Sequence, residues 1–377
     1  DQLEKNIGDV WDTGQVSSSA MFQIHYDGAA LKKNRDYFWK VCVWNQKDKS
    51  AWSETASWST GLFTASDWSA KWIGLDRPVG DDNPEAEGRP LSARMLRRDF
   101  SLSKKIKRAT VFVSGLGLYE LYLNGDKVGD QVLAPALTEY NKRTFYNTFD
   151  VTEQLDKGKN AVGVILGNGR YFAPRGETPT KTKTYGFPKL LLQMHVELVD
   201  GTSYTLISDE SWKLTTDGPI RGNNEFDGEF YDARSEMAGW ASPGFDDIKW
   251  IAAELSTPPG EELVAQTIEP IRVTETLQPV SVSEVSPGTF IFDMGQNMVG
   301  WARLRVKGKK NDTIKLRFAE VLNEEGGLYL DNIRGAKVTD TYICRGEDIE
   351  TWEPRFTYHG FRFVEMTGYP GTPDLSS

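Results

Sequence analysis

The residues best suited to binding chemistry lie in one short loop, residues 167–176, with the sequence GNGRYFAPRG. Arginine guanidinium and asparagine amide groups can bracket vicinal hydroxyls, so Asn168, Arg170 and Arg175 suit a sugar ligand. Tyr171 adds an aromatic ring of the kind on which a sugar ring stacks. Either this loop binds a carbohydrate, or it is a long β-sandwich loop packed against a neighbouring domain.

His359 is a second candidate, because it stands in the string YHGFR at the start of a predicted strand. The adjacent Gly360 permits an unusual backbone conformation or a close approach by another group. His359 therefore either contacts a ligand or a further domain, or it is structural. The other histidines, His25 and His195, stand in strand-like strings, and the chain has no G-x-S-x-G motif. A serine-hydrolase site is not predicted.

Acidic residues and cysteines do not indicate a catalytic or metal centre. The chain has 54 Asp and Glu residues, so a carboxylate pair for glycoside hydrolysis cannot be chosen by spacing. Glu120 and Glu365 lie in predicted strands and are expected to be solvent-facing partners of basic residues. Cys42 and Cys344 lie in different predicted domains without zinc-ligand spacing, so both are expected to be buried free thiols. No metal and no cofactor is predicted.

Composition restricts the class of protein. A net charge of −10 argues against nucleic acid as a partner, since tracking phosphates needs clustered Lys and Arg. The longest apolar runs have the length of a strand, so membrane insertion is not predicted. Twelve tryptophans in 377 residues fit a carbohydrate-handling protein, and they fit the aromatic cores of β-sandwiches equally well.

The elements that would position these residues are β-strands. Residues 118–123 read as a strand that ends at Asn124-Gly125, the pair that a two-residue hairpin loop favours, and residues 127–132 return beside it. A further apolar strand, AVGVILG, leads into the loop at 167–176. No segment has sustained 3.6-residue periodicity. The prediction is an all-β chain of tandem antiparallel β-sandwiches, jelly-roll or fibronectin-like.

Turn-rich boundaries divide the chain into three units and a tail. Residues 1–64 are predicted to be a partial fibronectin type III-like sandwich, because a complete one needs about seven strands. Residues 65–258 and 259–370 each contain enough strands for a sandwich, with a Pro-Pro-Gly cluster at their boundary. Residues 371–377 are interpreted as a linker to a following domain.

Several strings, in order along the chain, resemble the N-terminal β-domains of bacterial α-L-rhamnosidases. They are DWSAKWIG at 67–74, the long string from SGLGLYELYLNG onward at 114–152, FDMGQNMVGW at 292–301, LDNIRGAKVTDTY at 330–342 and WEPRFTYHGFRFVEMTG at 352–368. The resemblance runs through essentially the whole chain. It implies that residues 65–258 and 259–370 are two rhamnosidase β-sandwiches from a glycoside hydrolase that removes terminal α-L-rhamnose from glycans or glycosides.

The resemblance also implies where the chemistry lies. In this family an inverting pair of carboxylates sits in an α/α barrel that follows the β-domains, and neither the helical repeats nor the acidic motif of that barrel occurs in this sequence. The chain is therefore expected to be a non-catalytic part of the enzyme, with no catalytic residue of its own. Its expected partners are a rhamnose-containing glycan or glycoside and the missing catalytic domain of the same chain. A secreted or periplasmic location is expected.

Departures from the family leave other interpretations open. Some sugar-binding relatives of this sandwich hold L-rhamnose through calcium with an Asp-Asn pair, but Leu116-Gly117 occupies the matching position and supplies no side-chain oxygen. Asp81-Asp82-Asn83 could bind a cation, although a solvated acidic loop fits equally. Two alternatives from other classes are a stand-alone carbohydrate-binding protein without hydrolase activity and a structural, adhesin-like array of sandwiches.

A last group of polar residues lies in the strings at 292–301 and 330–342. These residues either form turn hydrogen bonds within the sandwich or face the missing barrel. They are Asp293, Gln296, Asn297, Asn332 and Arg334.

Overall fold

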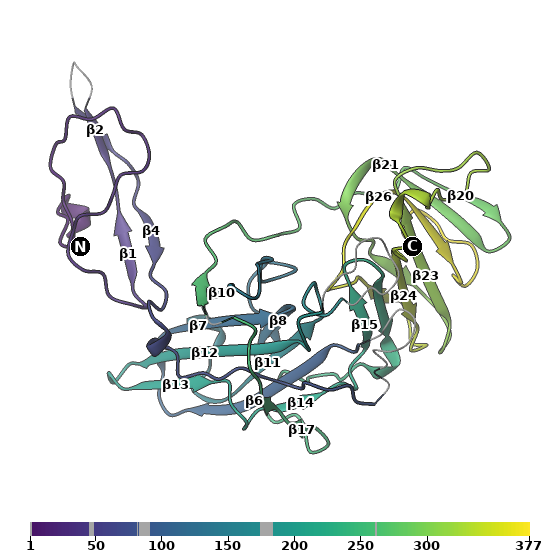
Figure 1. The fold of residues 1–377 in the computed structure, drawn as a ribbon, viewed down its shortest axis with the longest axis horizontal. Coiled ribbons are helices and arrows are strands. Elements are labelled where there is room, and N and C mark those ends of the chain that lie inside the picture. Colours follow the sequence, from purple (N-terminus) through teal and green to yellow (C-terminus); the bar gives the residue numbers. More distant parts are fainter. Residues whose placement is uncertain (1, 45–48, 81, 83–90, 174–183, 261) are drawn as a thin grey trace. The chain divides into compact units, whose positions relative to one another are not determined.

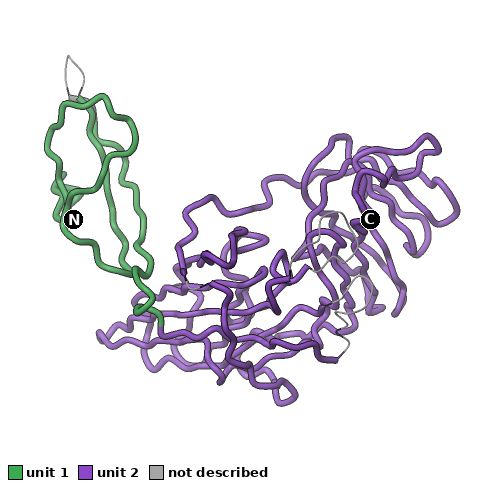
Figure 2. Tube along the Cα trace, viewed as in Figure 1, with its two compact units in different colours: residues 1–68 green, residues 69–377 purple. Residues whose placement is uncertain are grey.

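The computed structural model describes residues 2–44, 49–80, 82, 91–173, 184–260 and 262–377. The chain divides into two compact units, residues 1–68 and 69–377 (Figure 2). Strands are the main regular secondary structure of both units, which confirms the prediction of an all-β chain. Within the described ranges no helix is long and apolar enough to cross a membrane. The helical elements there are short 3-10 turns: η1 Leu3–Lys5, η2 Ala65–Asp67, η3 Thr152–Gln154, η4 Ala233–Ser235 and η5 Asp331–Ile333.

The first unit contains two pairs of antiparallel strands. The pairs are β1 (Asp36–Trp39) with β4 (Ala56–Ser59), and β2 (Cys42–Trp44) with β3 (Lys49–Trp52). Tyr37 stacks on Trp58 across the first pair, with ring centroids 5.3 Å apart. Strands β1 and β2 are separate because Val41, between them, exchanges hydrogen bonds with Ser53 instead of continuing the β1–β4 ladder.

The second unit begins with a β-sandwich of two sheets (Figure 1). The first sheet has the order β18–β5–β12–β7–β10–β19, with β13 beside β12. Its strands are β5 Ile73–Gly74, β7 Ile106–Leu116, β10 Arg143–Asp150, β12 Lys189–Leu198, β13 Ser203–Ile207, β18 Glu254–Leu255 and β19 Glu262–Ala265. The second sheet has the order β17–β14–β6–β11–β8–β9. Its strands are β6 Arg94–Leu102, β8 Leu118–Leu123, β9 Asp126–Lys127, β11 Gly158–Gly167, β14 Lys213–Thr215 and β17 Ile251–Ala252.

The predicted hairpin is confirmed at the edge of the second sheet. Asn124 and Gly125 have φ angles of 52° and 98°, as a loop with two left-handed residues requires. The returning strand β9 is only Asp126–Lys127, shorter than predicted. The Asn124 side chain donates to Asn160 Oδ1 at 2.9 Å, which fixes the loop against the start of β11.

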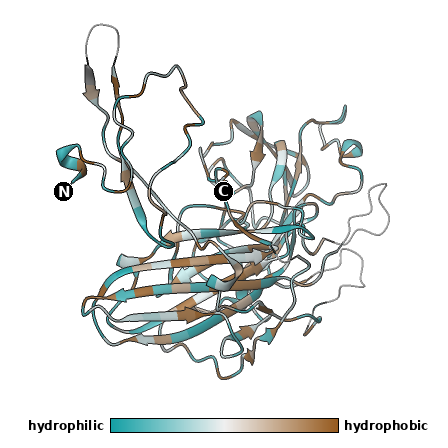
Figure 3. Cartoon of the chain, turned by 60° about the vertical axis from the view of Figure 1, so that its left-hand side comes forward, coloured by the Kyte–Doolittle hydropathy of each residue, from teal (hydrophilic) through white to brown (hydrophobic). Residues whose placement is uncertain are grey.

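Strand β11 of the second sheet is buried on both faces, and this explains its nearly continuous apolar sequence, AVGVILG. On β11, Val164 and Leu166 point into the core between the two sheets. Ile165, between them, packs into a second core that also contains residues of the C-terminal sheet. Side chains alternate along a strand, so both faces of β11 must be apolar. Brown, apolar segments accordingly follow the long strands in Figure 3.

The C-terminal sheet has the order β15–β16–β24–β23–β26–β21–β20. Its strands are β15 Ile220–Asn224, β16 Gly228–Asp232, β20 Ser281–Ser286, β21 Thr289–Gly300, β23 Thr313–Ala319, β24 Thr339–Ile343 and β26 His359–Thr367. A separate pair joins β22 (Leu304–Val306) to β25 (Glu350–Trp352).

Two segments cross the boundary that the sequence placed at residue 258. Strands β15 and β16 precede it but join the C-terminal sheet, where β16 pairs in parallel with β24. Strand β19 follows the boundary but pairs in parallel with β10 of the first sandwich. These are parallel pairings in a chain otherwise predicted to be antiparallel, and they interlock the two sandwiches of the second unit.

Candidate functional site

Asn168 joins the first sandwich to the β15–β16 hairpin. Its backbone N–H donates to Asn223 Oδ1 at 2.7 Å, and its side-chain Nδ2 donates to the backbone oxygens of Leu91 and Asn223 at 2.8 and 2.9 Å. The residue is 2% exposed. Asn168, which the sequence predicted to contact a sugar, therefore connects three backbone segments.

Arg170 keeps an exposed side chain. Its Nε donates to Glu225 at 2.6 Å, and its guanidinium lies 4.6 Å from the centroid of the Phe226 ring. The side chain is 40% exposed. Arg170 is thus accessible at the surface but already has a carboxylate and an aromatic partner. Arg175 lies outside the described residues.

The Tyr171 ring is enclosed. Tyr140 meets it edge-on at 5.1 Å and Tyr185 stacks on it at 5.9 Å, while Leu116 completes the cluster. Tyr171 is 1% exposed, and its burial raises the pKa of the hydroxyl well above the ordinary value. No face of this ring is open to a sugar in the structure.

His359 lies inside the C-terminal sandwich. Its ring stacks on Phe318 at 4.2 Å, and its Nε2 lies 3.1–3.2 Å from the two carboxylate oxygens of Asp340. Asp340 also accepts the backbone N–H of Glu229 at 2.9 Å. His359 is 3% exposed, so its visible role is to link β26 to β24 and β16.

The other sequence candidates are also engaged in internal contacts. Leu116 is fully buried, and Gly117 has a φ of 103° with a Cβ position only 2.3 Å from Gly167 O, so this pair shapes backbone packing. Asp82 forms a buried ion pair with Arg94 at 2.9 Å. Asp81 and Asn83 lie outside the described residues. The part of the chain that the structure describes contains no group of three or more His, Cys, Asp or Glu suited to a metal.

Neither Cys42 nor Cys344 forms a disulfide, as predicted, but the expectation that both are buried was wrong for Cys42. Cys344 is buried, and burial raises the pKa of its thiol to about 12, so it stays protonated. Cys42 is only partly buried. Glu120 and Glu365 do pair with basic residues, but the expectation that they face solvent was wrong, because their side chains are only 11% and 14% exposed.

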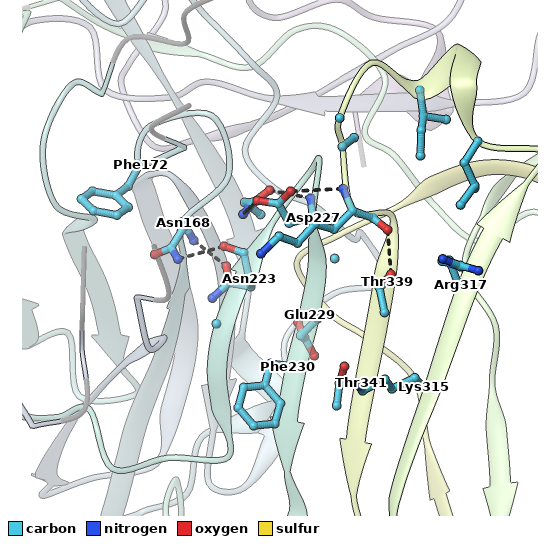
Figure 4. Close-up of a pocket in the computed structure, with 18 residues that line it drawn as sticks. Asn168, Phe172, Asn223, Asp227, Glu229, Phe230, Lys315, Arg317, Thr339 and Thr341 are labelled. Atoms are coloured by element: carbon cyan, nitrogen blue, oxygen red, sulfur yellow. Dashed lines mark hydrogen bonds between the residues drawn. The ribbon is translucent and has the colours of Figure 1, made fainter. Parts of the chain in front are cut away.

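One pocket, of about 540 Å³, lies on the C-terminal sheet (Figure 4). Its floor is the face of β16, β23 and β24 opposite the core residues Ile314 and Leu316. The β15–β16 hairpin and the segment from residue 330 to 337 form its walls. The lining residues are Asn168, Phe172, Gly222, Asn223, Asn224, Asp227, Gly228, Glu229, Phe230, Lys315, Arg317, Leu330, Ile333, Gly335, Ala336, Lys337, Thr339 and Thr341.

The two acids of the pocket are held by hydrogen bonds. The Asp227 carboxylate accepts from Asn224 Nδ2 at 3.1 Å and from the backbone N–H of Lys337 at 3.3 Å. Glu229 is 1% exposed, and its Oε2 accepts two backbone N–H groups at 3.1 Å. Burial raises the pKa of Glu229 to about 8. Asp227 therefore stabilises a loop, and Glu229 is a neutral, interior group at pH 7.

Sequence reasoning missed this pocket. Among the predicted site residues only Asn168 lines it. A usable signal existed in the string TIKLRFA, where Lys315 and Arg317 alternate with apolar residues and so share the face opposite the core. The remaining lining residues come from segments far apart in the sequence.

Among the described residues, hydrogen bonds link only some of the polar residues in the strings at 292–301 and 330–342. Exposed Glu320 accepts from Asn297 Nδ2 at 3.1 Å and from Asn332 Nδ2 at 3.4 Å, so it joins the two strings. Asp293 instead pairs with Arg362 through two hydrogen bonds of 2.8 and 2.9 Å.

Comparison with known proteins identifies these sandwiches as modules of glycoside hydrolases. The Rha78A-like N-terminal immunoglobulin domain matches residues 2–64, the α-L-rhamnosidase N-terminal domain matches residues 104–275, and the bacterial α-L-rhamnosidase concanavalin-like domain matches residues 283–377. The chain belongs to the α-L-rhamnosidase family and corresponds to its N-terminal region.

Individual relatives agree with this assignment. An α-L-rhamnosidase of Formosa agariphila is 36% identical over 397 residues, covering 99% of this chain and 42% of the relative. One from Streptomyces avermitilis is 46% identical over 291 residues, covering 76% of this chain and 28% of the relative. The chain therefore spans less than half the length of these curated relatives.

Solved structures share the fold. The α-L-rhamnosidase from Dictyoglomus thermophilum is 45% identical with a TM-score of 0.90, covering 99% of this chain and 42% of that one. The Streptomyces avermitilis enzyme, solved in complex with L-rhamnose, is 31% identical with a TM-score of 0.91, covering 100% of this chain and 52% of that one.

Proposed function

We propose that this chain is the non-catalytic β-domain part of an α-L-rhamnosidase. The whole protein would hydrolyse terminal α-L-rhamnose from glycans or glycosides by an inverting mechanism that uses two carboxylates. The observation that carries the proposal is the match to α-L-rhamnosidases over 99% of the chain. Because that match covers only 42% of the relatives, the proposal assigns the reacting carboxylates to the remainder of the whole protein.

The chemistry of the pocket supports a non-catalytic role for this chain. An inverting glycosidase needs one carboxylic acid that protonates the leaving oxygen and one carboxylate that activates water. Asp227 is engaged by two N–H donors, and Glu229 is 1% exposed with one oxygen occupied by two backbone N–H groups. Because Glu229 is almost fully buried, the pocket does not present the two accessible carboxyl groups that this mechanism needs.

Hydrolysis of 4-nitrophenyl α-L-rhamnopyranoside tests the proposal. The whole protein is expected to release 4-nitrophenolate, and the 377-residue chain is expected to release none. Turnover by the chain near the rate of the whole protein would place the active site within these residues. An inactive whole protein that binds L-rhamnose would favour the alternative of a carbohydrate-binding protein without hydrolase activity.

For the role of the β-domains, we propose that they hold the catalytic domain in position and contribute to substrate approach. Deletion of residues 1–377 from the whole protein is then expected to leave a catalytic domain that is poorly soluble or weakly active. Full activity of the deletion variant would contradict this role. We also propose a secreted or periplasmic location, because large glycans do not enter the cytoplasm freely, and cell fractionation with immunodetection tests it.

A further inference from the structure

The pocket on the C-terminal sheet is basic, although the chain as a whole has a net charge of −10. Lys315 and Arg317 rise from the same face of β23, and Lys337 lies on the wall above them. Lys315 and Lys337 are exposed. Within the described residues no carboxylate forms an ion pair with either lysine, whereas Arg317 pairs with Glu365 at 2.8 Å.

The acids of the pocket do not neutralise these cations. The lining has two carboxylates, and that of Asp227 already accepts hydrogen bonds from Asn224 and the Lys337 backbone. Glu229 is buried, and its pKa of about 8 leaves it mostly neutral. The lining therefore keeps an excess of positive charge that suits an anionic ligand.

The same pocket has an aromatic surface and buried donors that lack acceptors. Phe230 of β16 is 38% exposed and lines the pocket floor. Two buried donors of lining residues, Asn223 Nδ2 and Arg317 Nε, have no hydrogen-bond partner among the described residues. Asn223 is 4% exposed and is the partner of Glu229 in the β15–β16 ladder. A lining that contains both an exposed aromatic ring and unpaired donors fits an acceptor-rich ligand with an apolar face, such as a sugar.

We propose that this pocket binds an anionic monosaccharide unit of a glycan, with Lys315, Arg317 and Lys337 around the anionic group and Phe230 against the sugar ring. The inference rests on the proposed function in taking the ligand to be a carbohydrate. It deepens that function, because it specifies that the recognised glycan carries acidic units in addition to rhamnose. A hexuronate carboxylate and a sugar sulfate ester share the required chemistry.

Direct titration of the 377-residue chain by calorimetry at low ionic strength tests the inference. The ligands are D-glucuronate and D-glucose 6-sulfate, with D-glucose, L-rhamnose, acetate and sulfate as comparisons. At least one of the two anionic sugars is expected to bind more tightly than D-glucose, and more weakly when salt is added. A preference between them identifies the carboxylate or the sulfate ester as the recognised group.

Matched variants locate the binding. Lys315→Gln and Lys337→Gln are each expected to weaken binding of the anionic sugar by about fivefold to tenfold, because each removes a charge-assisted contact. Lys307→Gln removes the same charge from a side chain that is 73% exposed and outside the pocket, so it is expected to leave binding unchanged. Phe230→Ala is expected to weaken binding of the sugar anion and to leave binding of acetate or sulfate unchanged.

Three results would overturn the inference. The first is that acetate or sulfate binds as tightly as the sugar anions, and the second is that D-glucose binds as tightly as D-glucuronate and D-glucose 6-sulfate. The third is that the wild-type chain binds no sugar anion, or that both pocket lysine variants bind it as tightly as the wild type. None of these concerns the hydrolysis of a rhamnoside by the whole protein. An active whole protein whose β-domains bind no sugar anion would remove this inference and leave the proposed function intact.

Discussion

The ring of Phe356 lies against the backbone of Gly167 at the end of β11. A Cβ atom on residue 167 would stand 2.3 Å from Phe356 Cγ, closer than any side chain tolerates. Phe356 is fully buried in the core that joins the first sandwich to the C-terminal sheet. The contact between these two parts of the second unit therefore depends on the absence of a side chain at residue 167.

Gly167→Ala is expected to destabilise the second unit. Overpacking a filled core costs about 1–3 kcal/mol, and here the obstacle is a buried ring. Gly300→Ala is the matched control, since a Cβ at residue 300 meets no atom within 4 Å. Urea unfolding of residues 69–377 measures the stability of both variants. Equal unfolding midpoints for the two variants would show that Phe356 moves aside at little cost.

Asn168→Ala is expected to lower the free energy of unfolding by about 2–6 kcal/mol, because two buried backbone oxygens lose their donor at about 1–3 kcal/mol each. Arg170→Ala, two residues away, removes an exposed ion pair and is expected to cost less than about 1 kcal/mol. The same urea measurement compares them. A larger loss for Arg170→Ala would reverse the assignment of structural and surface roles in this loop.

The stability of the second unit is expected to fall as pH rises between about 4.5 and 8, through Glu229. Burial raises its pKa from 4.5 to about 8 in the folded state. Below pH 4.5 the carboxyl is protonated in both states; above it only the unfolded chain ionises, so the free energy of unfolding falls by about 1.4 kcal/mol per pH unit. Above about pH 8 both states are ionised and this dependence ends.

Glu229→Gln cannot ionise and is expected to lose this slope, as measured by urea unfolding at pH 5, 6, 7 and 8. Glu320→Gln changes an exposed carboxylate and serves as the control. Other titrating groups contribute equally to the pH dependence of the wild type and of the variants. The readout is therefore the difference between the wild type and Glu229→Gln in the slope of the unfolding free energy against pH. Parallel curves for the wild type and Glu229→Gln would contradict the raised pKa.

Residues 1–68 alone are expected to aggregate or to unfold without a cooperative transition. Phe38, Val43 and Trp58 are 63%, 66% and 44% exposed in this unit, and its strands form only pairs in the described residues. Unpaired strand edges with apolar side chains promote association. Thermal melting followed by circular dichroism tests this, with residues 69–377 as the well-packed control. A cooperative melt of residues 1–68 would refute the expectation.

Local sequence determined the β-structure of this chain. Asn124-Gly125 adopts the two positive φ angles that such a pair favours, because the preference belongs to the residues themselves. The alternation of Lys315 and Arg317 with apolar residues likewise fixed which face of β23 enters the core, since successive side chains point to opposite faces. The resemblance to α-L-rhamnosidases could also be recognised from the sequence, because each matching string is a contiguous run of residues.

Only the tertiary structure decided which polar residues are accessible. The sequence predicted that Asn168 and Tyr171, in the loop after β11, contact a ligand. In the structure they are covered by Asn223 and Tyr140, which are distant in the sequence. His359 is buried against Phe318 of β23, and Asp340 of β24 supplies a hydrogen-bond partner for its ring. The pocket is likewise assembled from the β15–β16 hairpin and strands more than eighty residues further on. Burial depends on which distant segments pack together, and local residue preferences do not encode that packing.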